Sequence, residues 1–180
     1  MGLAADLGYE LGHQNRFRKS AVALGSTRAM SNLNHKILGP ADRFILRLTR
    51  GKSTMTSWVT GIPPLWVTAM GARSGAPRTV PLLGIPIAGD LALLGTSFGQ
   101  KGTPAWVHNL EAHPEASVSY RERSVKVRAR PAEPAEAETV WQKAIDIYPG
   151  YGNYGGWAPH RRIRVFVLEA REGAADRQGD

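Results

Sequence analysis

Apolar and polar side chains alternate along two segments in the middle of the chain. Residues 116–121 and 125–130 place an apolar or small residue at every second position and a polar or basic residue between them. A period of two is typical of antiparallel strands that bury one face. Apolar and partly β-branched runs predict four further strands, over residues 64–70, 78–87, 91–96 and 163–168. We therefore expect six strands, joined mostly by short turns.

Three other segments have helical character. Pro104 suits the first turn of a helix that runs to residue 112, and apolar residues recur with a period of 3.6 from Pro134 to Tyr148. A third helix is predicted over residues 40–50. Too few strands are separated by helices for a doubly wound parallel sheet. The pattern predicts a mainly β fold, a small six-stranded antiparallel barrel with helices packed outside it.

The ends of the chain lack this pattern. Residues 1–30 are polar and weakly periodic, which predicts a poorly ordered N-terminal extension. Residues 171–180 read as a flexible tail, and residues 31–170 as one domain. No window approaches the ~18 apolar residues of a membrane span, so we expect a cytoplasmic protein.

Charge indicates an acidic partner. The chain has 23 Lys and Arg against 15 Asp and Glu, a net charge of +8, and residues 30–130 alone hold 13 basic and 5 acidic residues. Nucleic acid, anionic lipid and a polyanionic small molecule all fit such an excess. Arg43, Arg47 and Arg50 form a stripe on the helix predicted over 40–50, which is either a solvated face or a contact with an anionic membrane.

Several chemistries lack their residues. The chain has no cysteine, which excludes disulfides, thiolate ligands and cysteine nucleophiles. The five histidines show no metal-binding spacing, so we expect no metal site, and neither a nucleophile elbow nor a phosphate-binding P-loop motif is present. Catalysis by side chains alone has weak support, and a bound cofactor would supply the chemistry.

Three segments could form a site. Residues 71–78 are a glycine-containing turn in which Arg73 and Arg78 flank exposed backbone N–H groups, a suitable place for an anion or merely a solvated turn. Residues 95–106 run from a strand through a glycine-rich loop to a helix N-terminus, which offers its positive end to a ligand or simply connects two elements. In the third segment Tyr148, Tyr151 and Tyr154 recur every third residue, either as a site face or as core.

Together and in this order, the segments resemble the deazaflavin (F420)-dependent nitroreductase family of split β-barrel proteins. The resemblance covers residues 31–170. Its signature pieces are Thr68–Gly75, Pro77–Leu82, Ser97–Gly99, Pro104–Leu110 and Tyr148–Tyr151.

The resemblance implies a six-stranded antiparallel split β-barrel that binds reduced F420 and transfers a hydride from its deazaflavin C5 to a small electrophilic acceptor: a quinone, a nitroaromatic or an enone. It implies that basic residues grip the phosphate and acidic tail of the cofactor, and that tyrosines shape the substrate pocket. The expected cofactor-binding residues are Arg73, Ser74, Arg78, Pro81, Leu82, Leu83, Ser97, Phe98, Lys101, Pro104, Trp106 and Asn109. The expected catalytic residues are Tyr148, Tyr151 and Tyr154.

Departures from the family pattern leave the acceptor open. Ala72 stands where many members have Arg, Leu83 where the nitroreductase has a substrate-facing Tyr, and Phe98 where it has Lys. Two alternatives remain: an FMN-dependent oxidoreductase on the same barrel, and a non-catalytic deazaflavin carrier. No nucleic-acid-binding motif is present, so we expect no specific nucleic-acid partner.

Overall fold

The computed structural model describes residues 2–11, 63–97, 101–149, 151–153 and 162–171. Within these ranges seven strands form one antiparallel sheet in the order β2-β1-β5-β6-β7-β4-β3. The strands are β1 (Leu65–Met70), β2 (Pro77–Leu82), β3 (Ile85–Ile87), β4 (Asp90–Leu94), β5 (Glu115–Tyr120), β6 (Arg123–Pro131) and β7 (Val165–Ala170). The helices are α1 (Leu3–Leu7), α5 (Ala105–Ala112) and α6 (Pro134–Ile147).

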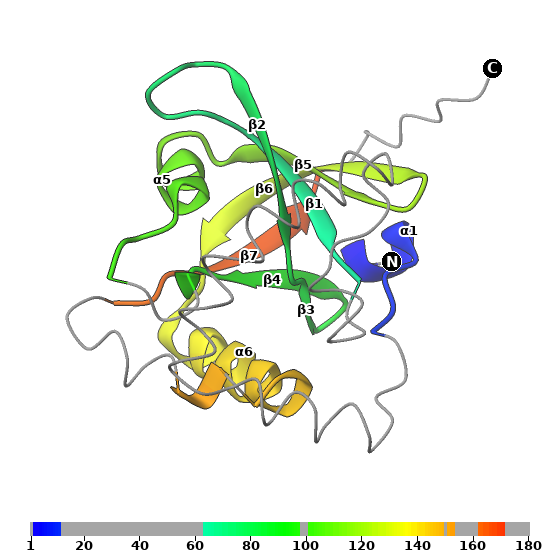
Figure 1. Cartoon of the computed structure of the whole chain (residues 1–180). Coiled ribbons are helices and arrows are strands. Elements are labelled where there is room, and N and C mark those ends of the chain that lie inside the picture. Colours follow the sequence, from blue (N-terminus) through cyan, green and yellow to red (C-terminus); the bar gives the residue numbers. More distant parts are fainter. Residues whose placement is uncertain (1, 12–62, 98–100, 150, 154–161, 172–180) are drawn as a thin grey trace.

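The two outermost strands of this sheet are consecutive in the chain. β2 ends at Leu82 and β3 begins at Ile85, so only Leu83 and Gly84 connect the opposite edges. Three residue steps span at most about 10 Å. A flat sheet of seven strands would hold its edges much farther apart, at nearly 5 Å for each strand spacing. The sheet therefore has to curl until its edges approach each other, and it forms a half-barrel (Figure 1).

This architecture confirms the predicted mainly β, antiparallel fold and corrects the number of strands. The single strand expected over 78–87 is two strands that pair with different neighbours, β2 with β1 and β3 with β4. The two strands are separated at Leu83 and Gly84. A Cβ on Gly84 would lie 3.4 Å from side-chain atoms of both Leu65 and Tyr9. The sequence pattern continues through this point because residues on both sides of the break are apolar.

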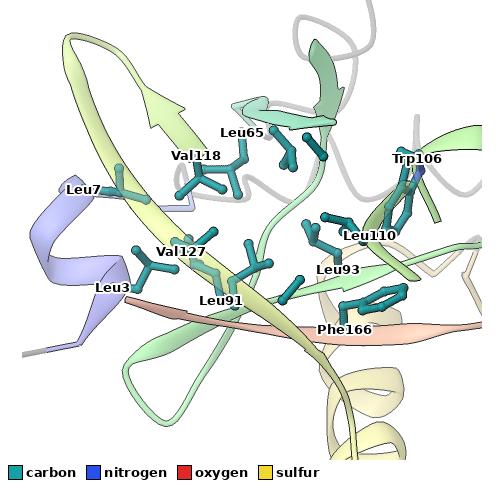
Figure 2. Close-up of a cluster of buried hydrophobic side chains, with 14 of the residues drawn as sticks. Leu3, Leu7, Leu65, Leu91, Leu93, Trp106, Leu110, Val118, Val127 and Phe166 are labelled. Atoms are coloured by element: carbon teal, nitrogen blue, oxygen red, sulfur yellow. The ribbon is translucent and has the colours of Figure 1, made fainter. Parts of the chain in front are cut away.

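Alternation along the strands builds the interior of the half-barrel. Leu65 and Val67 of β1 are almost fully buried, and the side chain of Trp66 between them is only half-buried. They pack with Val118 of β5 and Val127 of β6 in one cluster, shown in Figure 2. The predicted one-sided burial of these strands is therefore observed.

Strand β4 differs because both of its faces are buried. Leu91 and Leu93 join the interior cluster, whereas Ala92 and Leu94 join a second cluster with Val140 of α6. Helix α6 lies beside β3 and β4 (Figure 1) and covers their outer face. A strand covered on both sides requires an unbroken apolar run, which explains why residues 91–94 show no alternation.

The N-terminal residues belong to the same core. Leu3 and Leu7 of α1 have 0% and 1% of their surface exposed and lie among the buried side chains of the sheet (Figure 2). The N–H of Ala4 donates to the carbonyl oxygen of Gly89 at 3.0 Å. Gly2 approaches the same turn so closely that a Cβ would lie 2.3 Å from that oxygen.

Tyr9 attaches this segment to the link between the sheet edges. Its hydroxyl lies 3.3 Å from the carbonyl oxygen of Gly84 and 3.1 Å from that of Pro63, and can donate to either. Its ring packs edge-on against Tyr120, with centroids 5.0 Å apart, and burial raises the pKa of the Tyr9 hydroxyl.

The prediction of a poorly ordered extension is therefore wrong for residues 2–11. Residues 2–11 are mainly apolar, with Leu3 and Leu7 one helical turn apart, and these two side chains fill space inside the curled sheet. The helix predicted over 40–50, with Arg43, Arg47 and Arg50, lies outside the described residues, as do residues 172–180 of the predicted tail. None of the helices in the described part of the chain is long and apolar enough to cross a membrane.

An ion-pair network connects α6 to the sheet. The guanidinium of Arg130 on β6 donates to both carboxylate oxygens of Glu136 on α6, at 2.7 and 2.8 Å, and to Glu169 on β7 at 2.6 Å. The hydrogen bonds from Arg130, followed by that from the Glu133 N–H, lower the pKa of Glu136 to about 2. The Arg130–Glu136 ion pair stabilises the protein only while Glu136 is ionised.

The first prediction concerns the N-terminal segment. Leu7→Ala should lower the free energy of unfolding by about 2–5 kcal/mol, because it leaves a cavity among fully buried side chains. Chemical denaturation measures this loss, and Glu10→Ala, at an exposed position of the same segment, should cost much less. Equal and small losses for both variants would show that the segment does not pack in the core.

The second prediction concerns pH. The folded-state pKa of Glu136 is depressed, so its contribution is complete above pH 4.5, the ordinary pKa of a glutamate, and is lost as the pH falls towards 2. Glu136→Gln should therefore be less stable than the wild type at pH 7, and the difference should shrink on acidification. Denaturation at several pH values tests this, with the exposed Glu122→Gln as control. A difference that does not change with pH would contradict the ionic role.

Candidate functional site

The turn between β1 and β2 is held in a compact shape by its own hydrogen bonds. The N–H of Gly71 donates to Ala76 at 2.9 Å, and the N–H of Gly75 donates to Gly71 at 2.8 Å. Gly75 has a φ of +60°, and a Cβ on Gly71 would lie 2.5 Å from the Ser74 hydroxyl oxygen. Gly75 therefore suits the left-handed conformation of the turn, and Gly71 leaves room for the Ser74 hydroxyl where the chain returns towards β2.

The turn presents two cations to solvent. Arg73, Ser74 and Arg78 are exposed, and one Nη of Arg78 donates to the Ser74 hydroxyl at 3.4 Å. None of the ion pairs within the described residues includes Arg73 or Arg78. Their guanidinium groups can accordingly bind an anion without first breaking one of these ion pairs.

Strand β2 places the expected cofactor-binding residues on two faces. Residues directly opposite each other in an antiparallel pair lie on the same face. Arg78 faces Ala69 and Leu82 faces Leu65, so both lie on the interior face of the sheet. Pro81 faces the half-buried Trp66 on the outer face. One ligand along the interior face would meet the side chains of Arg78 and Leu82, and at Pro81 only the backbone.

The loop after β4 passes close to α5. The N–H of Gly95 donates to Arg164 at 2.8 Å, and a Cβ on Gly95 would lie 2.8 Å from Val107, so only glycine fits there. Ser97 follows with a φ of +48°, a conformation that few non-glycine residues adopt. Phe98 lies outside the described residues, and Lys101 is exposed. The loop therefore packs against α5 at Gly95, and Ser97 follows two residues later in a left-handed backbone conformation.

Helix α5 begins after Pro104 and carries two expected residues in different environments. Trp106 is 9% exposed and packs against Phe166 with ring centroids 6.0 Å apart, so most of its indole is core. Asn109 is half-buried, and its Oδ1 accepts the N–H of Ala72 at 3.0 Å. This bond brings α5 beside the arginine-bearing turn, although the two are 37 residues apart in the sequence.

The tyrosine segment begins with a tight turn. The N–H of Tyr151 donates to Tyr148 at 3.0 Å, a bond across three residues. The two rings do not share one open face, however: they meet edge-on at 5.7 Å, and Tyr151 also packs against Trp141 at 6.4 Å. Tyr151 is 8% exposed, and burial raises the pKa of its hydroxyl. Tyr148 is less buried, and Tyr154 lies outside the described residues.

Leu83 connects this aromatic group to the barrel. It lies in the link between β2 and β3 and packs, like Tyr148, against the second apolar cluster. The structure thus brings Leu83 to the tyrosine segment and Asn109 to the arginine-bearing turn.

These observations define the class of fold: the described chain is an antiparallel half-barrel with flanking helices and an exposed cationic turn. A family model described as "F420H(2)-dependent quinone reductase" matches residues 43–170. The chain belongs to this family, whose members are F420-dependent oxidoreductases with coenzyme F420 as cofactor. The predicted resemblance to F420-dependent enzymes is thereby confirmed.

Individual proteins similar to this chain agree with the family match. The chain is 28% identical over 117 residues to the F420H(2)-dependent quinone reductase Rv1261c of Mycobacterium tuberculosis, covering 63% of this chain and 78% of that protein. The solved structure of an F420-H2 dependent reductase, FDR-A, is 33% identical with a TM-score of 0.54, covering 59% of this chain and 94% of that one. A structure described as a domain-swapped dimer is 30% identical with a TM-score of 0.56, covering 71% and 95%.

The residues of this chain fit such a cofactor. F420 carries a phosphodiester and a polyglutamate tail, and a polyanion requires cations that are free to approach it. Arg73 and Arg78 meet this requirement because both are exposed. Gly71, at the start of the turn that carries them, leaves room for the Ser74 hydroxyl, which a Cβ would approach to 2.5 Å. These residues would hold the acidic part of the cofactor.

The third prediction tests this role. Arg78→Gln should weaken binding of F420 by about 10- to 100-fold, because a charge-assisted contact to the anionic part is lost. Arg121→Gln, an exposed arginine at the β5–β6 turn, removes the same charge elsewhere and should change affinity little. Fluorescence titration of F420 measures both. Equal effects would mean that only the overall charge matters.

Proposed function

We propose that this chain reduces quinones with F420H(2), transferring a hydride to the acceptor. The family match supports the reaction class, and the observation that carries the proposal is the exposed pair Arg73 and Arg78 on a turn held against α5. When bound, reduced F420 supplies the hydride from C5 of its deazaflavin. The protein's own task is to hold the cofactor and orient the acceptor.

The residues divide this task by position. Arg73, Ser74 and Arg78 bind the acidic part of the cofactor at one end of β2. Leu82 and Leu83, at the other end of that strand, provide apolar surface for the ring system. Because these groups lie on one strand and its continuation, their spacing is set by the sheet.

A tyrosine completes the reduction in this proposal. Quinone reduction to a quinol consumes a hydride and a proton, so a hydrogen-bond donor beside the acceptor oxygen stabilises the charge that develops there. Tyr148 is the better placed of the described tyrosines, because Tyr151 is buried between Tyr148 and Trp141. We assign Tyr148 the role of donor and Tyr151 that of support.

The fourth prediction tests the reaction. Reduced F420 mixed with the protein and a soluble quinone should be oxidised much faster than without protein, as followed by deazaflavin absorbance. Tyr148→Phe should lower kcat and leave the dissociation constant of F420 nearly unchanged, because the lost hydroxyl faces the acceptor.

Other outcomes would contradict the proposal in distinguishable ways. Tight FMN binding without F420 binding would indicate a flavin enzyme, and F420 binding without oxidation by any acceptor would indicate a carrier. Faster reduction of nitroaromatics or enones than of quinones would change the acceptor class. Weaker F420 binding by Tyr148→Phe would place Tyr148 in the cofactor site.

A further inference from the structure

The turn that carries Arg73 and Arg78 is exposed along its whole length. Residues 72–79 are all exposed, and the turn is stabilised internally by the two backbone bonds between Gly71, Gly75 and Ala76. These bonds set its shape, and the pairing of Met70 with Pro77 holds its base on the sheet. The tip that carries Arg73 extends beyond this pairing, and a contact with another element would restrain it further.

Asn109 provides such a contact from a rigid base. Its Oδ1 accepts the Ala72 N–H at 3.0 Å, and Ala72 precedes Arg73 directly. Asn109 lies on α5 among Trp106, Val107 and Leu110, whose exposures are 9%, 0% and 2%. The buried side chains of Trp106, Val107 and Leu110 thus hold α5 in the core, and the side-chain amide of Asn109 reaches the turn.

We propose that Asn109 is a positioning residue whose carbonyl oxygen, by holding the Ala72 N–H, fixes the direction of Arg73, beside the strand-borne Arg78, towards an anionic ligand. The proposal rests on the proposed function, in which that ligand is the phosphate-bearing part of F420. A restrained turn loses less conformational freedom when it binds, so the bond contributes to affinity without touching the ligand.

An alternative is that the Asn109 amide contacts the cofactor directly. The two cases differ in their dependence on the Ala72 N–H, which proline at position 72 removes while leaving Asn109 intact. Ala72 is the first residue inside the turn closed by Gly71 and Gly75, the position at which turns favour proline.

The fifth prediction is a double-mutant cycle. Asn109→Ala and Ala72→Pro should each weaken F420 binding by about 3- to 10-fold in a fluorescence titration, because both remove the same hydrogen bond. The double variant should be no weaker than the single ones. At saturating F420, kcat should stay at the wild-type value, which separates the loss from general damage to the site. His108→Ala, at the preceding exposed position of α5, serves as control.

A second readout needs no ligand. In the free protein, the Ala72 amide should exchange its hydrogen faster in Asn109→Ala than in the wild type, and Asn109→Asp, which keeps an acceptor oxygen, should restore protection. Unchanged exchange would overturn the hydrogen bond itself.

The outcomes distinguish failure of the positioning role from failure of the proposed function. A loss in Asn109→Ala with none in Ala72→Pro, or additive losses, would show direct contact and overturn the positioning role. A wild type that binds F420 and an Asn109→Ala that binds equally well would overturn the positioning role alone. A wild type that does not bind F420 would overturn the proposed function, and with it the role of Asn109 towards that cofactor.

Discussion

The short link between β2 and β3 is the constraint on which the rest of the structure depends. Leu83 and Gly84 join the two outer strands of a seven-stranded sheet, so the edges must approach each other. Curling gives the sheet an inside, where the first apolar cluster forms, and an outside at β3 and β4, where α6 packs. Tyr9 attaches the N-terminal segment to the same link through Gly84.

This closure also sets the distances within the candidate site. The arginine-bearing turn precedes β2, and Leu83 follows β2. One strand therefore separates the cationic turn from the second apolar cluster, which includes Tyr151. The strand is short and paired along its whole length with β1, which makes the separation rigid. An elongated ligand with an acidic end and a flat apolar end suits such a strand.

The described tyrosines show how tertiary packing divides chemically similar residues. Their spacing of three residues left open whether they form one face of a site or pack in the core, and the N–H of Tyr151 donates to Tyr148 in a tight turn. Trp141 of α6, however, takes up the ring of Tyr151 and leaves the less buried Tyr148 as the candidate donor. Sequence spacing describes the local turn, but the helix packed beside it decides which tyrosine is buried.

By itself, the sequence determined the antiparallel strands, the helices α5 and α6 and the composition of the cationic turn, because these depend on the period of apolar residues and on local glycine and proline chemistry. The tertiary structure decided what depends on contacts between distant residues: the break at Gly84, the packing of Leu3 and Leu7, and the bond from Ala72 to Asn109. The link at Gly84 and the bond to Asn109 leave no periodic trace in the sequence, and the spacing of Leu3 and Leu7 does not say what they pack against. These contacts form only when the curled sheet brings the segments together.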